Sequence, residues 1–226
     1  METPTKSRPA PLSVASRRRR LLAAAVAMLV AGCVPHQPGP QPGPQPQPPQ
    51  PRIVARLYYW DAPNLIRVER AGSAIPVANG MALFENDVVE TMWSYSRLDF
   101  PGTGQVWLDV NTRVRVGSLW LFFGRLFASV DSPFPVSTDD VTASPEGTRF
   151  GVRRDRQSGD YAVAVEVGRV LCTGRRIAFR YLVPAGSALF ATPRASPQQP
   201  RPINLQGEIG WARAPMSGAR PQSQIR

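Results

Sequence analysis

The sequence predicts an all-β fold, with a single domain of short strands arranged as a sandwich or a short β-solenoid. Apolar and polar residues alternate through much of 52–190, which is typical of strands that bury one face. Turn-forming residues interrupt this pattern at intervals of about 8–12 residues. No run keeps a helical period for longer than about two turns. We expect a disordered tether before this domain and a disordered tail after it.

Composition divides the 226 residues into four parts. Residues 1–32 are predicted to be a signal peptide, and residues 33–51 a cysteine followed by a Pro/Gln-rich tether. The β-domain is expected over 52–190, which is long enough to bury a hydrophobic core. Residues 191–226 are predicted to be a mostly flexible basic tail.

The N-terminal segment has the features of a bacterial lipoprotein signal. Four arginines, Arg17–Arg20, precede an apolar run of ten residues, Leu21–Val30. This run is shorter than the roughly 20 residues that span a bilayer, and it suits a signal peptide. The following Val30-Ala31-Gly32-Cys33 resembles the lipobox, which implies that Cys33 becomes an acylated N-terminus carrying palmitate or a similar chain. Several acyl chains anchor a protein stably. An ordinary secretory signal is the alternative.

We expect the anchored chain to lie in the bacterial cell envelope. Val34 rather than Asp follows the cysteine, and by resemblance this favours the outer membrane, facing the periplasm. Ser16 followed by two arginines leaves twin-arginine export open beside the general secretory route. Residues 35–51 contain nine prolines. They favour polyproline II and would space the domain up to roughly 50 Å from the membrane. Recognition by a proline-binding module is the alternative.

Charge and residue usage argue against several classes of function. The formal net charge is +11, but residues 52–190 carry 16 arginines against 14 acidic residues, so the excess lies at the two ends. A nucleic-acid binder would concentrate charge on its folded domain. The single histidine, His36, lies in the tether, which excludes a histidine triad or a His-ligated zinc site in the domain. We expect Cys172 to be a small buried residue, and we expect no metal and no cofactor.

The expected strands are short and follow one another closely. In order they are Ile53–Trp60, Leu65–Arg70, Met81–Phe84, Asp87–Thr91, Arg97–Phe100, Gln105–Val110, Thr112–Val116, Trp120–Phe123, Leu126–Val130 and Phe134–Thr138. Pro101–Gly104 is predicted to be a hairpin turn. Gly124 and the β-prone aromatics around it favour two strands over a helix. Ile203–Leu205 and Ile209–Trp211 are candidates for a last hairpin.

The stretch Pro145–Gly174 is predicted to form two strands joined by a polar loop at Ser158–Asp160. Apolar residues alternate with small or polar ones over Tyr161–Val167, as in a strand with one buried face. Gly147 and Gly168 interrupt the two arms. Glycines at such positions usually mark bends, bulges or a close approach of the backbone.

The order of these strands resembles the FecR-type domain of bacterial envelope proteins. The matching motifs are Val68-Glu69-Arg70-Ala71-Gly72, Leu83, Asn86-Asp87-Val88-Val89-Glu90-Thr91, Ser96-Arg97-Leu98-Asp99-Phe100, Asn111-Thr112-Arg113-Val114, Phe123-Gly124-Arg125-Leu126, Phe134-Pro135-Val136-Ser137-Thr138, Gly147-Thr148-Arg149-Phe150-Gly151-Val152 and Val163-Ala164-Val165-Glu166-Val167-Gly168-Arg169-Val170. They cover about residues 65 to 188. Asn86 stands where the family has glycine, and Asn tolerates φ > 0 better than most residues. The resemblance implies structural roles for Asp87, Thr91, Gly147, Thr148 and Gly168.

The best-known members of this family are inner-membrane regulators that carry a cytoplasmic anti-sigma segment. We expect this chain to have neither that segment after processing nor a transmembrane helix. The resemblance then implies an envelope-facing domain without catalysis. The leading hypothesis is a lipid-anchored binding or scaffolding module for an envelope protein or glycan. A sensor in a transenvelope signalling system is the alternative.

A glycan hydrolase is a further alternative, because Asp139, Asp140 and Glu146 could supply paired carboxylates. The ordinary interpretation places the two aspartates in a solvated loop and Glu146 beside a turn. We therefore expect no enzyme activity.

Among the tryptophans, Trp93 is the candidate for partner binding. It lies in Thr91–Tyr95, which is predicted to be a turn. Trp107 and Trp120 lie on predicted strands, where an aromatic residue is more often part of the core.

Overall fold

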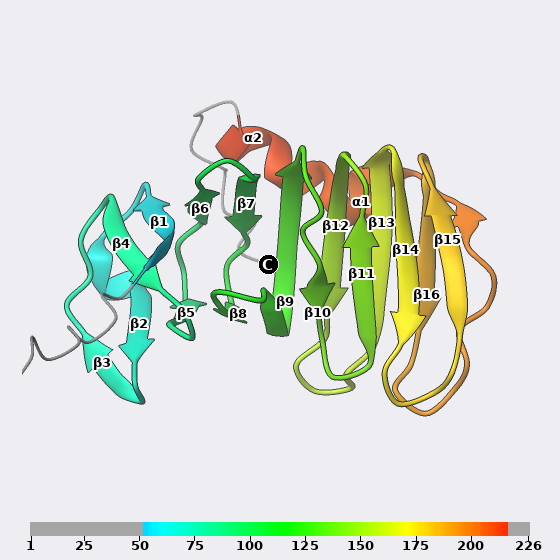
Figure 1. Cartoon of the computed structure of the whole chain (residues 1–226), viewed down its shortest axis with the longest axis horizontal. Helices are drawn as coiled ribbons and strands as arrows, with labels where there is room; N and C mark the ends of the chain where they lie inside the picture. Colours follow the sequence, from blue (N-terminus) through cyan, green and yellow to red (C-terminus); the bar gives the residue numbers. More distant parts are fainter. Residues whose placement is uncertain (1–51, 217–226) are drawn as a thin grey trace, which may run out of the picture. The chain divides into compact units, whose positions relative to one another are not determined.

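A computed structural model describes residues 52–216 of the chain. The all-β prediction is confirmed: these residues form 17 strands, and the helical elements are short (Figure 1). The predicted signal peptide, Cys33 and the tether lie outside the described residues. Between residues 52 and 216, no helix is long and apolar enough to cross a membrane.

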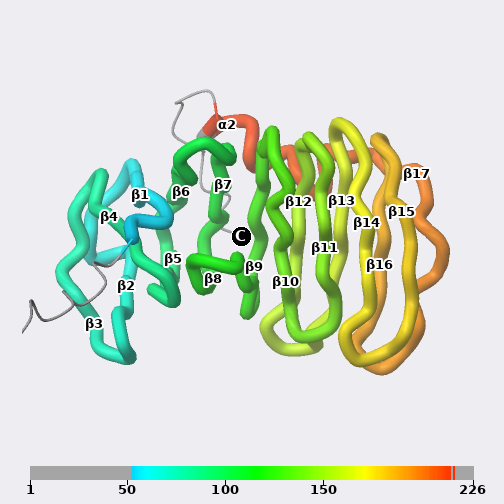
Figure 2. The backbone as a smooth tube through the Cα atoms, viewed as in Figure 1, coloured from blue at the N-terminus to red at the C-terminus, as the bar shows by residue number. Residues whose placement is uncertain are grey.

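Short connections join the strands (Figure 2). The strands are β1 (Ile53–Tyr59), β2 (Ile66–Arg70), β3 (Ser73–Ile75), β4 (Met81–Phe84), β5 (Val88–Thr91), β6 (Ser96–Phe100), β7 (Gly104–Leu108), β8 (Thr112–Arg115), β9 (Trp120–Val130), β10 (Val136–Ser137), β11 (Val141–Pro145), β12 (Thr148–Arg154), β13 (Tyr161–Val167), β14 (Arg169–Gly174), β15 (Arg180–Pro184), β16 (Ser187–Ala191) and β17 (Arg201–Pro202). The helical elements are η1 (Pro63–Leu65), α1 (Leu205–Ile209), η2 (Gly210–Ala212) and α2 (Arg213–Met216).

The strands form two sheets that share β9. Sheet A has the order β4-β1-β6-β7-β9-β12-β13-β16-β17. Sheet B has the order β3-β2-β5-β8-β9-β10-β11-β14-β15. Neighbouring strands are antiparallel except β9 and β10. Through β9 the hydrogen bonding is continuous over all 17 strands.

Gly124 lets β9 pass from one sheet to the other. Trp120–Phe123 pair with β8 in sheet B, whereas Leu126–Val130 pair with β7 and β12 in sheet A. Gly124 has φ +98°, and a Cβ there would lie 2.5 Å from Cα of Thr112. Only glycine can adopt this positive φ where there is no space for a Cβ. The prediction of two separate strands is therefore wrong, because the glycine bends one strand without ending it.

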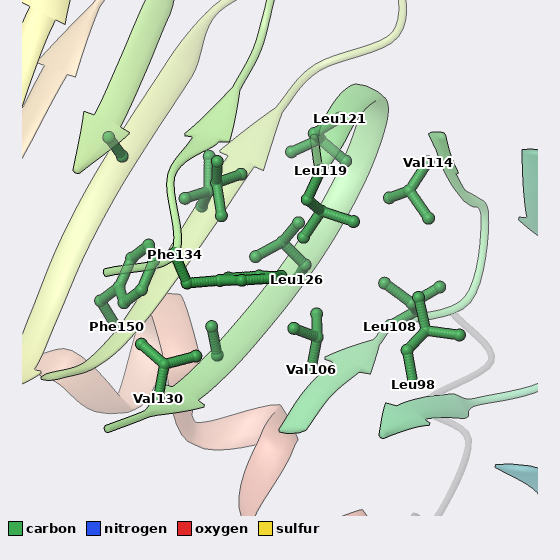
Figure 3. Close-up of a cluster of buried hydrophobic side chains, with 14 of the residues drawn as sticks. Leu98, Val106, Leu108, Val114, Leu119, Leu121, Leu126, Val130, Phe134 and Phe150 are labelled. Carbon is green, nitrogen blue, oxygen red and sulfur yellow. The ribbon is translucent and has the colours of Figure 1, made fainter. Parts of the chain in front are cut away.

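The core lies between the two sheets. Leu98 and Leu108 of sheet A belong to one buried cluster with Val114 and Leu121 of sheet B, and all four are fully buried (Figure 3). Burial of such a side chain contributes about 1.5–3 kcal/mol to folding. Cys172 on β14 belongs to the same cluster, and it is a free thiol.

The C-terminal segment covers part of the outer face of sheet A. A second buried cluster joins the helical residues to the sheet and contains Trp107, Phe127, Ala164, Ala188, Ile209 and Ala212. The predicted hairpin at Ile203–Leu205 and Ile209–Trp211 is wrong. Asn204 instead caps α1, since its side chain accepts a hydrogen bond from the backbone N–H of Gln206. The folded domain therefore extends to residue 216, beyond the predicted boundary at 190.

Candidate functional site

Two polar residues that the FecR-type resemblance singles out, Asp87 and Thr91, are buried between strands. Asp87 accepts hydrogen bonds from Nε of Arg70 at 2.9 Å, from Nη2 of Arg70 at 2.7 Å and from the backbone N–H of Phe84 at 2.9 Å. Thr91 on β5 accepts a hydrogen bond from the backbone N–H of Thr112 on β8 at 2.9 Å. Both residues therefore join neighbouring segments, and neither presents a group to solvent.

The motif glycines lie where the chain crosses between the sheets. Gly147 leads from β11 to β12 with φ +60°, and Gly168 leads from β13 to β14 with φ +84°. The two crossings touch: a Cβ on Gly168 would lie 2.9 Å from the carbonyl oxygen of Gly147 and 2.7 Å from Cγ2 of Thr148. Thr148 is itself buried. This part of the motif offers a geometry rather than a reactive group.

The three carboxylates considered for a hydrolase do not meet in one cleft. Asp139 and Asp140 lie between β10 and β11, whereas Glu146 follows the other end of β11. A strand rises about 3.3 Å per residue, so Glu146 lies roughly 20 Å from Asp140. Carboxylate pairs of glycosidases are about 5–10 Å apart. Glu146 instead pairs with Arg169 at 3.1 Å near the surface.

Asp139 and Asp140 are held by arginines. Nη2 of Arg154 lies 2.9 Å from Oδ2 of Asp139 and 3.5 Å from Oδ2 of Asp140. Nη1 of Arg176 lies 3.6 Å from Oδ1 of Asp140. The predicted solvated loop is wrong for Asp140, which is only 4% exposed. Its burial explains the two arginines, because a buried carboxylate without a counter-charge is costly.

Trp93 lies between β5 and β6 and is 71% exposed. Trp107, by contrast, is 5% exposed beneath the C-terminal segment and packs at a centroid distance of 6.0 Å from Phe127. Trp93 is thus accessible to a partner. Among residues 52–216 no aromatic ring or guanidinium stacks on it.

The outer face of sheet B brings together a set of side chains that the sequence does not place side by side. Successive cross-strand partners are Arg115 (β8), Trp120 (β9), Ser137 (β10), Thr142 (β11), Thr173 (β14) and Arg180 (β15). We call these six residues the cross-strand row. Their sequence neighbours, such as Val114, Leu121 and Cys172, are fully buried, so the row faces away from the core. At about 4.8 Å per strand, the row is roughly 24 Å long.

Aromatic rings hold three arginines at this surface. The guanidinium carbons of Arg115 and Arg175 lie 5.3 Å and 4.7 Å from the centroid of the Trp120 ring. That of Arg156 lies 4.4 Å from the centroid of Phe123, also on β9. None of the ion pairs between residues 52 and 216 involves these three arginines. Cation–π contact fixes a guanidinium while its N–H donors remain available for a ligand.

The other half of the same face is neutralised. Over β2, β5 and β8, Arg67 and Arg113 pair with Glu69 at 3.0 Å and 2.8 Å, and Arg113 also pairs with Glu90 at 2.6 Å. The guanidiniums without carboxylate partners therefore begin with Arg115 at the end of β8 and continue over the strands beyond it. In Figure 1 the strands β10, β11, β14 and β15 lie in front, α1 lies behind them, and α2 lies at the upper edge near β7. The cross-strand row is thus on the side of the domain that these helices leave open.

The amino-acid sequence alone does not reveal this surface, and the reason is topological. The alternation of Arg113 and Arg115 with apolar residues indicates an outward-facing pair, and Arg175 and Arg176 follow a predicted strand. These signals lie about 60 residues apart in the sequence. Only the order β8-β9-β10-β11-β14-β15 brings them to one face.

The described residues show no candidate for metal chemistry. No group of three or more His, Cys, Asp or Glu side chains within 52–216 could hold a metal ion. The candidate functional site of this domain is the cross-strand row, a surface of cationic, aromatic and hydroxyl side chains.

The sequence matches no protein-family profile and no curated protein. Two similar solved structures are crystal structures described as a proposed anti-sigma factor from Parabacteroides distasonis. They are 18% and 19% identical to this chain, with TM-scores of 0.48 and 0.47. The matches cover 55% and 54% of this chain and 64% and 62% of those chains, so this chain spans less than two thirds of their length. This likeness is too distant to carry a function, and the FecR-type resemblance stays a prediction.

Proposed function

We propose that this chain is a lipid-anchored module of a bacterial cell envelope that binds an envelope component and performs no catalysis. The observation that carries the proposal is the cross-strand row together with the arginines held on Trp120. Guanidiniums that are fixed in place and lack carboxylate partners are strong, directional donors for an anionic ligand. A sheet face that the described helices leave open gives a ligand room to reach them.

Sequence features supply the anchoring half of the proposal. The lipobox-like segment ending at Cys33 would place the acyl chains in the membrane, and residues 35–51 would extend the domain by up to roughly 50 Å. A binding domain on such a tether can reach material at a distance from the bilayer. Paired-carboxylate hydrolysis is not part of this function, because Asp140 and Glu146 lie far apart and are each paired with arginine.

The anchor is tested by mass spectrometry of the membrane fraction. We expect an N-terminal peptide that begins at an acylated Cys33. An unmodified Cys33 in a processed chain would remove the anchor from the proposal.

Binding is tested separately with the processed chain, residues 33–226, carrying Cys33→Ser so that no lipid contributes. The purified protein is mixed with washed envelope fragments, and the fraction that sediments is measured. We expect the parent protein to sediment with the envelope fragments, and we expect Arg115→Ala/Arg175→Ala to reduce the sedimented fraction. The control Arg67→Ala/Arg169→Ala removes the same charge from paired arginines and is expected to be retained like the parent. Equal retention of both double variants, or none for the parent, would contradict the proposed binding surface.

A further inference from the structure

We infer that the cross-strand row binds an acidic polysaccharide, a sugar chain that bears carboxylates and lies across the strands of sheet B. This inference rests on the proposed function and names the chemical class of its ligand. The surface has three parts that such a chain would contact: cationic groups at one end, hydroxyls in the middle and a further arginine at the other end.

The two ends of the row supply charge. Arg115 and Arg175 share the Trp120 ring at one end, at 5.3 Å and 4.7 Å from its centroid. Arg180, opposite Thr173, closes the other end, and none of the ion pairs within 52–216 includes it. Arginine binds carboxylates with two parallel N–H donors. A ligand that satisfies both ends must carry carboxylates roughly 24 Å apart, because about five strand spacings of about 4.8 Å separate β8 from β15. That separation requires a polymer.

The middle of the row supplies hydroxyls. Ser137, Thr142 and Thr173 come from three adjacent strands, and the hydroxyl oxygens of Ser137 and Thr142 are 3.1 Å apart. Each hydroxyl can donate one hydrogen bond and accept others. Sugar hydroxyls have the same dual capacity, so a saccharide can pair with this segment where an apolar peptide side chain cannot.

Nucleic acid fits this surface less well. Single strands bind through aromatic side chains on which bases stack. Here guanidiniums lie over the rings of Trp120 and Phe123, so neither ring is free as a platform. Asp139 and Asp140, which lie between β10 and β11, are already paired with Arg154 and Arg176, so they neutralise little of the charge of the row.

The test is affinity electrophoresis of the processed chain with Cys33→Ser. Native gels contain polygalacturonate, a carboxylated polysaccharide, or dextran, a neutral one. We expect polygalacturonate to retard the protein and dextran to leave its mobility unchanged. Arg115→Ala/Arg175→Ala is expected to weaken the apparent affinity about tenfold or more, because it removes charge-assisted hydrogen bonds to the carboxylates of the ligand. Arg180→Ala is expected to weaken it to a smaller extent.

Two controls decide whether the row itself is responsible. Arg67→Ala/Arg169→Ala lowers the charge of the same sheet by the same amount outside the row and should bind polygalacturonate like the parent. Arg115→Lys/Arg175→Lys keeps the charge, removes the planar fork and should recover only part of the affinity. Circular dichroism of each variant shows that it is folded. Equal losses in the two Ala double variants would overturn the inference in favour of diffuse charge attraction.

The same protein is also tested with phosphatidylglycerol vesicles and with single-stranded DNA. Binding to either of these that exceeds binding to polygalacturonate at equal ionic strength would overturn the ligand class. Retention by envelope fragments through Arg115 and Arg175 would still support the proposed function in that case. If the parent protein binds neither polygalacturonate nor envelope fragments, the result counts against both the proposed function and the proposed ligand class.

Discussion

Ile209 of α1 packs its side chain directly against Gly151 in the middle of β12, in the place where a Cβ of residue 151 would stand. Gly151 faces outward from sheet A, and β12 pairs there with β9 and β13. The contact exists because the sheet presents almost no side chain at this point. It fixes where the C-terminal segment can lie on the sheet.

Gly151→Ala is therefore expected to destabilise the domain. The new methyl group must displace Ile209, and overpacking of this kind costs about 1–3 kcal/mol. Urea unfolding followed by tryptophan fluorescence measures the loss. Gly207→Ala in α1 is the control, since no atom lies within 4 Å of its Cβ position and alanine is the better helix former. A neutral result for Gly151→Ala would mean that the helix does not pack at this position.

The contact also explains why the sequence predicted a tail here. Helix α1 has five residues and cannot be recognised from periodicity, because one turn and a half shows no repeat. The part of sheet A on which α1 packs is equally hard to recognise from the sequence, since Ala164 and Ala188 resemble ordinary small residues on strands. The signal that was present is Asn204, a favoured helix cap. The prolines and glutamines around Asn204 are more typical of a flexible tail than of a helix.

Gly168→Ala is expected to cost more than a glycine substitution at an open turn. The residue has φ +84°, and its Cβ would lie 2.7 Å from Cγ2 of Thr148. A left-handed conformation costs an L-residue about 1–2 kcal/mol before any crowding. Gly186→Ala measures this conformational cost without crowding, because Gly186 has φ +76° and no atom lies within 4 Å of its Cβ position. The difference in unfolding free energy between the two variants should exceed about 1 kcal/mol. Equal losses of unfolding free energy in the two variants would show that the chain around Gly168 relaxes without cost.

Alternation predicted most strands because one face of each sheet packs on the core. Ile53–Tyr59 and Thr112–Arg115 agree with the expected segments to within about a residue. Arg180–Pro184 and Ser187–Ala191 escaped notice, since they are short and follow a run of charged residues. The site could not be predicted in the same way. Arg115 and Arg180 belong to one row only because four strands between them pair in a particular order.

Asp87→Ala is expected to destabilise the domain by about 2–3 kcal/mol. Its carboxylate is buried and bidentate with Arg70, and removal of one partner from a buried pair costs about 3–5 kcal/mol. Arg70 is 36% exposed, so water compensates part of the loss. Glu146→Ala serves as the control, because its pair with Arg169 is exposed on both sides and should contribute less than about 1 kcal/mol. Chemical denaturation measures both. A similar small effect for both would show that Asp87 is not required for the strand arrangement.

Trp93→Ala is expected to leave the melting temperature within about 2 °C of the parent, because the side chain is 71% exposed. Trp107→Ala is the contrasting substitution and should cost about 3–5 kcal/mol, since it empties the contact with the C-terminal segment. If Trp93 contacts a partner, Trp93→Ala also lowers retention by envelope fragments. A large loss of stability in Trp93→Ala would show instead that this residue belongs to the core.

Cys172 is expected to be inert towards thiol reagents in the native protein. The side chain is fully buried, and burial raises the pKa of its thiol to about 12. The reactive thiolate is then about one part in 10⁴ at pH 8. In a chain with Cys33→Ser, maleimide should label Cys172 only when denaturant unfolds the domain.

Moving the thiol by one position tests the direction of the cross-strand row. In Cys172→Ala/Thr173→Cys the thiol stands on the outer face of β14, opposite Arg180. Side chains alternate along a strand, so this variant should be labelled rapidly without denaturant. A shift of register by one residue would reverse both results. Slow labelling at position 173 with rapid labelling of Cys172 would therefore show that Thr173 faces inward and that the row does not form a surface.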